Sequence, residues 1–316
     1  MNTNAQTSRI LSLTMNPSVD ESSRTDRVVP DDKLRCSAPE REPGGGGINV
    51  SRAVAKLGGS APAFFTAGGP PGEVLQTLLA AEGLERHPLA VDGWTRSNLT
   101  VLEESAEQQF RFVFPGAALA ETEWQRCLGE LEDQHTNYLV ASGSLPPGVP
   151  EDFYARLAER SAERGVKLIV DTSGAPLEHA ARAGVYLLKP NIRELQQLAG
   201  ASVEDEEGLE HFAYRLVARG ACDVLVVSLG AGGALLVTDD SHHYVRSPTV
   251  PIKSKVGAGD SMVGGIVLGL ARGLSVLEAV RFGVAAGAAA VMTPGTELCR
   301  REDTEQLYTR TRQEQD

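Results

Sequence analysis

The segment Val256-Gly257-Ala258-Gly259-Asp260-Ser261 combines a glycine-rich turn with a carboxylate at the start of a predicted helix. Backbone N–H groups in the first turn of a helix lack partners within the helix, so they bind anionic oxygens well. A carboxylate at that place can remove a proton from an attacking hydroxyl while the N–H groups hold developing negative charge. In isolation, Asp260 has an ordinary explanation as well, because acids stabilise helix N-termini.

Two further segments contain residue types that bind phosphate and metal ions. Four consecutive glycines, Gly44 to Gly47, lead into a predicted helix with Asn49, and they would let the backbone approach a ligand closely. A flexible loop explains the same glycines equally well. Asn191 and Glu194 share one face of a predicted helix, which suits water-mediated contacts to Mg²⁺, although such a pair is more often plain helix surface.

A predicted hairpin carries two arginines that form a third candidate for ligand binding. Residues 97–103 and 108–114 alternate polar and apolar side chains across a polar turn, which predicts two antiparallel strands with one wet face. Arg96 and Arg111 lie on this hairpin, where two guanidinium groups facing a cleft could hold a phosphate. The ordinary alternative is that they are solvated edge residues that discourage strand pairing.

These residues must be positioned by a fold in which strands and helices alternate. Such alternation indicates βαβ units and a doubly wound parallel sheet, which binds ligands beyond the carboxyl ends of its strands. The predicted strands of this sheet include residues 10–15, 137–142, 166–171, 185–188 and 223–228. We therefore expect a single doubly wound α/β domain over residues 1–316, with helices on both faces of the sheet. A small antiparallel β lid is expected from about residues 20–42 and 94–116.

The composition excludes several other classes of protein. Lys and Arg total 30 against 42 acids, and the formal net charge of −12 provides no basic surface for nucleic acid or anionic lipid. No run reaches the ~18 apolar residues of a membrane span. Neither a P-loop nor a dinucleotide-binding fingerprint occurs, which disfavours an NAD-dependent oxidoreductase. The four scattered cysteines form no zinc or redox motif, which indicates reduced thiols and a cytoplasmic protein.

In chain order, these segments resemble the PfkB family of ribokinase-like carbohydrate kinases, from about Ile10 to Tyr308. The segments that carry the resemblance are Asn16-Pro17-Ser18-Val19-Asp20, Gly44–Asn49, Lys189-Pro190-Asn191-Ile192-Arg193-Glu194, Ser228-Leu229-Gly230 and Gly257–Asp260. Each is weak alone, whereas their order and spacing together are specific. Finer segments are similar to the minor-isozyme type of bacterial 6-phosphofructokinase, among them Lys33-Leu34-Arg35-Cys36 and Trp94-Thr95-Arg96. Gly46 supports this branch, since 1-phosphofructokinases and tagatose-6-phosphate kinases usually carry lysine there.

The resemblance implies a role for each candidate residue. Asp260 would be the base that deprotonates the C1 hydroxyl of fructose 6-phosphate, with Gly257, Ala258 and Gly259 as the anion hole. The residues implied to hold the sugar phosphate are Asp20, Lys33, Gly45, Asn49, Arg96, Arg111 and Ser144. Those implied to line the nucleotide side are Lys189, Asn191, Glu194, Ser228, Gly230 and Gly233, with Asn191 and Glu194 contacting Mg²⁺ through water. Those that match a K⁺ site of the family are Ser254, Val256, Ala290 and Gly295.

The activity implied is ATP- and Mg²⁺-dependent phosphorylation of fructose 6-phosphate to fructose 1,6-bisphosphate, a glycolytic reaction. The alternatives are tagatose-6-phosphate kinase, 1-phosphofructokinase, and a non-catalytic sugar-phosphate or nucleotide sensor on the same fold. A small sheet with an apolar face, here including Leu99, Val101, Phe112 and Phe114, is marginally stable alone and exposes its edges. We therefore expect a homodimer through the lid, as relatives of this type form, and no nucleic-acid or membrane partner.

Overall fold

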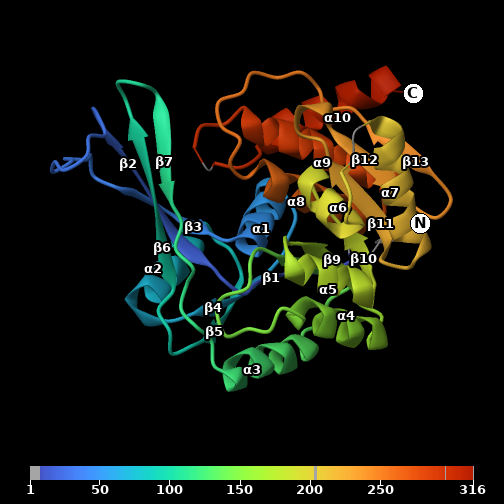
Figure 1. Ribbon diagram of the computed structural model, residues 1–316, viewed down its shortest axis with the longest axis horizontal. Coiled ribbons are helices and arrows are strands. Elements are labelled where there is room, and N and C mark those ends of the chain that lie inside the picture. Colours follow the sequence, from blue (N-terminus) through green and yellow to red (C-terminus); the bar gives the residue numbers. More distant parts are fainter. Residues whose placement is uncertain (1–7, 203–204, 296, 316) are drawn as a thin grey trace, which may run out of the picture.

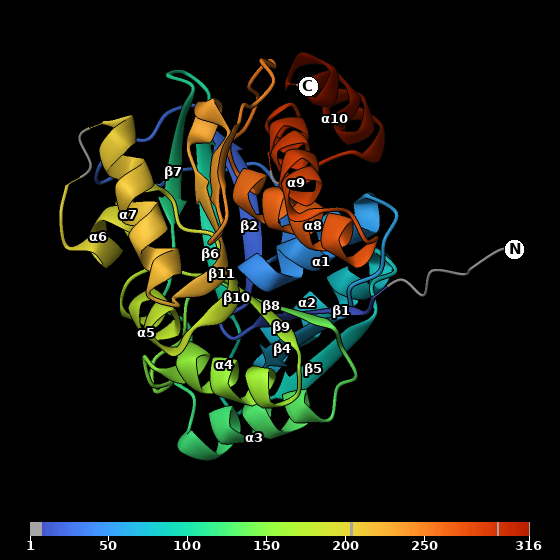
Figure 2. The ribbon, with the colours of Figure 1, turned by 90° about the vertical axis from the view of Figure 1, so that its right-hand side faces the viewer.

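A large, mostly parallel sheet occupies the centre of the protein (Figures 1 and 2). The computed structural model describes residues 8–202, 205–295 and 297–315. In spatial order its strands are β13 (His242–Val245), β12 (Ala234–Val237), β11 (Cys222–Ser228), β10 (Val185–Leu188), β9 (Lys167–Asp171), β8 (Tyr138–Ser142), β1 (Ile10–Thr14), β4 (Ala63–Ala67) and β5 (Arg86–Ala90). Neighbours pair in parallel from β11 to β5, and β12 and β13 add an antiparallel edge. The predicted strands and doubly wound sheet are therefore confirmed.

Helices cover both faces of this sheet, as Figure 2 shows. One face packs against α3 (Glu121–Glu132), α4 (Phe153–Glu163), α5 (Ala175–Ala183), α6 (Ile192–Ala199) and α7 (Glu206–Ala218). The other packs against α1 (Gly46–Lys56), α8 (Ala258–Ala271) and α9 (Val276–Val291), with α2 (Gly69–Ala81) beside β4 and α10 (Arg301–Gln315) on α9. Alternate residues of one strand serve the two layers, because side chains along a strand point to opposite faces. In β8, Leu139 belongs to the first core and Val140 to the second.

Small residues let α8 and α9 approach each other closely. A Cβ added to Gly265 would lie 2.8 Å from the Cα of Gly283, so a larger residue would force the two helices apart. The apolar stretch 282–292 lies largely in the buried helix α9. Among the described residues, no helix combines the length and apolarity needed to cross a membrane.

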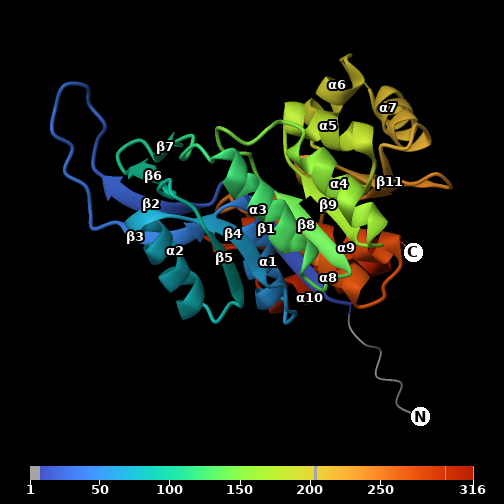
Figure 3. The same cartoon turned by 90° about the horizontal axis from the view of Figure 1, so that it is seen from below.

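A smaller sheet, here called the lid, stands to one side of the large sheet (Figures 1 and 3). Its described strands lie in the order β3 (Glu40–Gly44), β2 (Ser18–Thr25), β6 (Arg96–Glu103) and β7 (Gln108–Phe112). The lid is built from two chain segments, β2 with β3 and β6 with β7. Each segment leaves the body at a strand of the large sheet, because β2 follows β1 and β6 follows β5. The lid roots therefore lie near the ends of those strands.

The pairing inside the lid differs from the antiparallel sheet that we expected. The outer pairs, β2 with β3 and β6 with β7, are antiparallel, but the central pair β2 and β6 is parallel. The reason is that β2 and β6 both start at the root of the lid, so both run outward in the same direction. Sequence patterns describe each hairpin separately and carry no information on how two distant segments pair.

Candidate active site

Asp260 lies in the first turn of α8, whose start is shaped by glycine. Gly257 caps the helix with a φ of 75°, in the left-handed region that favours glycine. A Cβ at this position would also lie 2.4 Å from Cδ2 of Leu298. Glycine is thus required by backbone conformation and by space. It leaves the first N–H groups of α8 beside the carboxylate of Asp260, the arrangement that binds anions.

The carboxylate of Asp260 is held by a side chain from another helix. Asn49, on α1, donates a hydrogen bond from Nδ2 to Oδ2 of Asp260 over 2.9 Å. The pKa of Asp260 is raised to about 6, first by burial and then by the nearby Asp171 carboxylate. The hydrogen bond from Asn49 and the charges of Lys189 and Arg52 act in the opposite direction. A carboxylate with this pKa is ionised at neutral pH and accepts a proton more readily than an ordinary Asp.

Lys189 and Asp171 form a buried ion pair next to the start of α8. Lys189 follows β10, Asp171 ends β9, and Nζ and Oδ1 are 3.0 Å apart. Burial lowers the pKa of Lys189, but the carboxylates of Asp171, Glu194 and Asp260 together outweigh burial, so the net shift is upward and the ammonium stays charged. A Cβ on Gly259 would lie 3.9 Å from this Nζ. Sequence reasoning missed Asp171, although its place at the end of a predicted buried strand was a usable signal.

A cavity of about 630 Å³ opens at the root of the lid and contains Asn16, Arg96 and Ser144. Arg96 donates to the carbonyl oxygens of Phe114 and Asn16, over 2.7 and 2.9 Å. Its Nε is buried and has no hydrogen-bond partner among the described residues. An unpartnered buried donor on a guanidinium fits an anionic ligand such as phosphate.

Asn16 lines this cavity and Asn98 lies on the lid strand that carries Arg96, and neither was among the predicted site residues. Asn16 Nδ2 donates to Oγ of Ser144 over 3.2 Å, which ties the chain after β1 to the turn after β8. Asn98 Nδ2 donates to Oδ1 of Asp20 over 2.9 Å. Asp20, a predicted site residue, therefore lies on the same face of the lid as Arg96. Asn98 lies two residues after Arg96 in the predicted hairpin, so both side chains share one face of the strand. This spacing was the signal in the sequence that could have identified Asn98.

The glycines before α1 are packed rather than free. A Cβ on Gly46 would lie 2.3 Å from Oγ of Ser142, and one on Gly45 would lie 2.7 Å from Cγ2 of Thr14. These glycines therefore let α1 start directly against the carboxyl ends of β1 and β8. The packing favours the ligand-site interpretation over a flexible loop, because it fixes Asn49 in the first turns of α1.

The predicted nucleotide side lies at the ends of β10 and β11. The N–H of Ser228 donates to the carbonyl of Pro190 over 2.9 Å, which joins the two segments. Gly230 to Gly232 form a short 3₁₀ turn before Gly233 and β12. Asn191 and Glu194 cap their own helix: Oε2 of Glu194 accepts from the N–H of Asn191, and Oδ1 of Asn191 accepts from that of Glu194.

The nucleotide side offers one amide and one carboxylate, from Asn191 and Glu194, as ligands for a metal ion. Among the described residues, no three His, Cys, Asp or Glu side chains come together as a metal cluster. Magnesium in phosphate-transfer sites keeps several waters and uses one or two carboxylates, so the pair Asn191 and Glu194 fits contacts through water. Burial raises the pKa of Glu194, and the hydrogen bonds from Asn191 oppose that shift.

The residues predicted to bind K⁺ lie in the segment before α8 (Ser254 and Val256), in the last turn of α9 (Ala290) and just beyond it (Gly295). The N–H groups of Lys253 and Ser254 both donate to the carbonyl of Val291, which holds the segment before α8 against the end of α9. The carbonyl of Ala290 already accepts from the N–H and Oγ1 of Thr293, over 3.2 and 2.7 Å. A cation at Ser254, Val256, Ala290 and Gly295 would have to share that oxygen, so these residues fit it only in part.

Two predicted residues lie elsewhere on the lid. Lys33, in the loop between β2 and β3, and Arg111, on β7, are both exposed.

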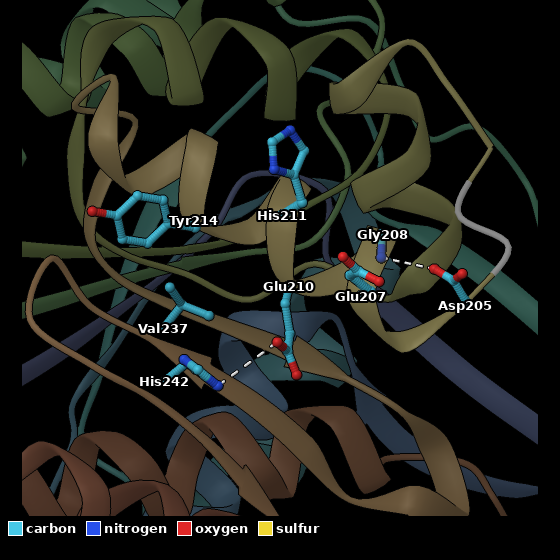
Figure 4. Close-up of a pocket in the computed structure, with 8 residues that line it drawn as sticks. All are labelled: Asp205, Glu207, Gly208, Glu210, His211, Tyr214, Val237 and His242. Atoms are coloured by element: carbon cyan, nitrogen blue, oxygen red, sulfur yellow. Dashed lines mark hydrogen bonds and ion pairs between the residues drawn. The ribbon is translucent and has the colours of Figure 1, made fainter.

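A cavity of about 600 Å³ beside α7 contains none of the predicted residues (Figure 4). Figure 4 shows His242 directed at Glu210 there, with further carboxylates from Asp205 and Glu207. Such an acidic lining repels phosphate, so the lid-root cavity is the better substrate site.

Comparisons with known proteins agree with this geometry. A profile of the pfkB family carbohydrate kinases matches residues 13–303. The chain is 46% identical over 302 residues to the ATP-dependent 6-phosphofructokinase isozyme 2 of Escherichia coli, which covers 95% of this chain and 98% of that protein.

Two crystal structures of Escherichia coli phosphofructokinase-2 also match, each over 96% of this chain and 99% of theirs. The complex with potassium has a TM-score of 0.94 at 44% identity, and the complex with fructose-6-phosphate has 0.92 at 43%. The ribokinase-like fold and the resemblance to the minor-isozyme branch are thereby confirmed. With a family profile that spans most of its length and a relative this similar, the chain belongs to the pfkB family of carbohydrate kinases.

Proposed function

We propose that this protein is a 6-phosphofructokinase, which transfers the γ-phosphoryl group of ATP to the C1 hydroxyl of fructose 6-phosphate. The products are fructose 1,6-bisphosphate and ADP. The observation that carries the proposal is the placement of Asp260, held by Asn49 in the first turn of α8 beside the buried Lys189. The names of its similar relatives point to the same reaction.

In the proposed reaction, Asp260 accepts the proton of the attacking hydroxyl. The N–H groups of Gly257, Ala258 and Gly259 and the ammonium of Lys189 offset the negative charge of the transferred group. Phosphoryl transfer needs positioning and charge neutralisation more than covalent chemistry, and these groups supply both. A lid over the site would exclude water and so limit wasteful hydrolysis of ATP.

Arg96 is the residue proposed to bind the 6-phosphate. Its two terminal nitrogens are held by backbone carbonyls, which fixes the guanidinium plane, and its buried Nε has no hydrogen-bond partner among the described residues. Ser144 and Asn16 share the cavity and offer further polar contacts. Asp20 and Asn49 are proposed to bind sugar hydroxyls, and Gly45 to permit close approach of the sugar.

The nucleotide is proposed to lie along Lys189, Asn191, Ser228, Gly230 and Gly233. Magnesium, when bound with ATP, would neutralise part of the phosphate charge. Asn191 and Glu194 would reach it through water, since both side chains already cap α6. We also propose a monovalent cation at Ser254, before α8, and Ala290, in the last turn of α9. Activation should be weak, because Thr293 already donates to the Ala290 carbonyl. Rates in KCl against tetramethylammonium chloride at equal ionic strength test this; strong K⁺ dependence would contradict it.

Among the related sugar phosphates, fructose 6-phosphate is favoured by Gly46. Kinases for fructose 1-phosphate and tagatose 6-phosphate usually carry lysine at that position. Here a Cβ would lie 2.3 Å from Oγ of Ser142, so this backbone leaves no room for lysine. The non-catalytic sensor is disfavoured because Asp260 and its anion-binding turn are intact.

A substrate panel tests the proposed function. Fructose 6-phosphate, tagatose 6-phosphate and fructose 1-phosphate are each supplied with ATP and Mg²⁺, and ADP release is followed by a coupled assay. Phosphorus NMR of the product then identifies the phosphorylated carbon. We expect the highest kcat/KM with fructose 6-phosphate and a new phosphate at C1. A preference for another sugar would overturn the substrate, and binding without ADP release would support the sensor.

We propose further that the chain forms one domain with its lid and that two chains form a dimer through their lids. Leu99 lies opposite Phe112 on the paired strands β6 and β7, and Val101 lies opposite Phe110, so these four side chains share one face. Phe112 is 51% exposed, which is costly for an aromatic ring in an isolated chain. A second lid would cover this face.

A cytoplasmic location fits a kinase that uses ATP and has free thiols.

A further inference from the structure

Asn49, which binds Asp260, is itself held by a buried arginine. Arg52 lies one helical turn further along α1, and its side chain is only 4% exposed. Its Nη1 donates to Oδ1 of Asn49 over 3.3 Å, while Nδ2 of Asn49 donates to Asp260. The two ends of one amide are therefore used by two different charged groups.

Arg52 is in turn fixed by residues from two other elements. Glu82, at the end of α2, accepts from Nε and Nη2 in a bidentate pair, at distances between 2.7 and 3.0 Å. The carbonyl of Pro43, in lid strand β3, accepts from Nη1 over 3.2 Å. Glu42 of the same strand lies 3.6 Å from Nη2. One buried guanidinium thus joins α1, α2 and the root of the lid.

This arrangement decides which way the amide of Asn49 points. An arginine only donates hydrogen bonds and a carboxylate only accepts them. If the amide were turned over, its NH₂ would face the guanidinium of Arg52 and its oxygen would face the carboxylate of Asp260. Both contacts would then be repulsive. With Arg52 in place, only the orientation that donates to Asp260 satisfies both neighbours.

We propose that Arg52 and Glu82 are positioning residues for phosphoryl transfer, which orient Asn49 so that one oxygen of Asp260 is held and the other is free to take the substrate proton. The proposal rests on the proposed role of Asp260 as base. Glu82 is needed because a buried arginine without a counter-ion is unstable. Because Arg52 also donates to the carbonyl of Pro43, one guanidinium holds both Asn49, which binds the base, and the root of the lid.

The charges around Asp260 make the proposal visible in a pH profile. Asp171, at the end of β9, raises the pKa of Asp260, whereas Lys189 after β10 and Arg52 on α1 lower it, together with the hydrogen bond from Asn49. Removing Arg52 takes away one of these charges and frees the amide. Both changes raise the pKa of Asp260, so the acid limb of kcat moves to higher pH.

The test compares Arg52→Met with Arg52→Lys and Glu82→Gln. For Arg52→Met we expect kcat to fall by about 10- to 100-fold, the scale of a misplaced catalytic group, with a much smaller change in the KM for fructose 6-phosphate. The acid limb should move to higher pH. Arg52→Lys should recover part of kcat because it keeps the charge, and Glu82→Gln should give a smaller loss. Arg182→Met, in an exposed pair with Glu178 on α5, is the matched control that should leave kcat unchanged.

A double-mutant cycle with Asn49→Ala shows whether Arg52 acts through that amide. If it does, Arg52→Met costs little further kcat once Asn49 is absent, because the two losses are not additive. Fully additive losses would overturn the proposal. So would a lower melting temperature with unchanged kcat and unchanged acid limb, which is the result of a purely structural role. If Arg52→Met does not fold, Glu82→Gln and Arg52→Lys decide on the same readouts. Normal activity of Asp260→Asn would refute the proposed base instead.

Discussion

At the scale of single residues, the raised pKa of Asp260 governs how activity depends on pH. Asp260 must be ionised to accept a proton, and burial beside Asp171 raises its pKa to about 6. We therefore expect kcat/KM to fall as the pH decreases through about 6. Initial rates at subsaturating fructose 6-phosphate, measured across this range with a pH-independent coupling system, check this. An acid limb near the ordinary pKa of an aspartate would contradict it.

Replacing Asp260 separates catalysis from stability. Asp260→Asn removes the base while keeping the shape, so kcat should fall by at least ~10²–10⁴ with substrate binding retained.

Because the pKa of Asp260 is raised above the ordinary 3.8 on folding, the native state loses stability as the pH rises from about 4 to about 6. Asp260→Asn should therefore melt at a higher temperature than the parent at pH 8, and at the same temperature below about pH 4. The exposed Asp239→Asn is the control; a near-normal kcat in Asp260→Asn would disprove the base.

Arg96 provides a test of how the sugar phosphate is bound. Arg96→Ala should raise the KM for fructose 6-phosphate far more than the KM for ATP, since only the former loses its phosphate contact. Arg96→Lys should restore only part of the affinity, because an ammonium cannot reproduce the planar donor group. Steady-state kinetics with each substrate varied in turn measure both constants. Arg24→Ala, exposed on the same lid, is the control, and equal increases in the two KM values would argue against the assignment.

At the scale of secondary-structure elements, a glycine that caps a helix and a glycine inside a helix should respond oppositely to alanine. Gly257→Ala meets Leu298 and a left-handed backbone, so it should destabilise the fold by about 1–2 kcal/mol or more and distort the start of α8, lowering kcat. Gly129, in the middle of α3, has open space around it, so Gly129→Ala should stabilise by about 0.5–1 kcal/mol without affecting kcat. Urea unfolding and steady-state rates of both variants measure this. Equal effects would show that local geometry at Gly257 is not decisive.

At the scale of the whole molecule, the exposed apolar face of the lid predicts that activity depends on protein concentration. Lids that pair would supply the interface and the substrate contacts together, so activity per chain should fall on dilution below the dimer dissociation constant. Sedimentation velocity and rate measurements over the same dilution series test this. Phe112→Glu should move both transitions to higher concentration, because it places a charge in the apolar face. A fully active monomer would exclude the lid dimer.

The sequence by itself determined the elements, the fold class and most of the candidate site. Apolar runs and glycine stops are local, so they predicted β11 and α1 without tertiary information. The Gly257–Asp260 turn is local as well, and parallel sheets bring such turns to one edge.

Only the tertiary structure decided which of these residues meet. Asn49 and Asp260 are 211 positions apart, and their hydrogen bond depends on how α1 and α8 pack. The same is true of the parallel pairing of β2 with β6 and of the ion pair between Lys189 and Asp171. Contacts of this kind arise from packing between distant segments, whereas sequence patterns report only what each segment buries and exposes.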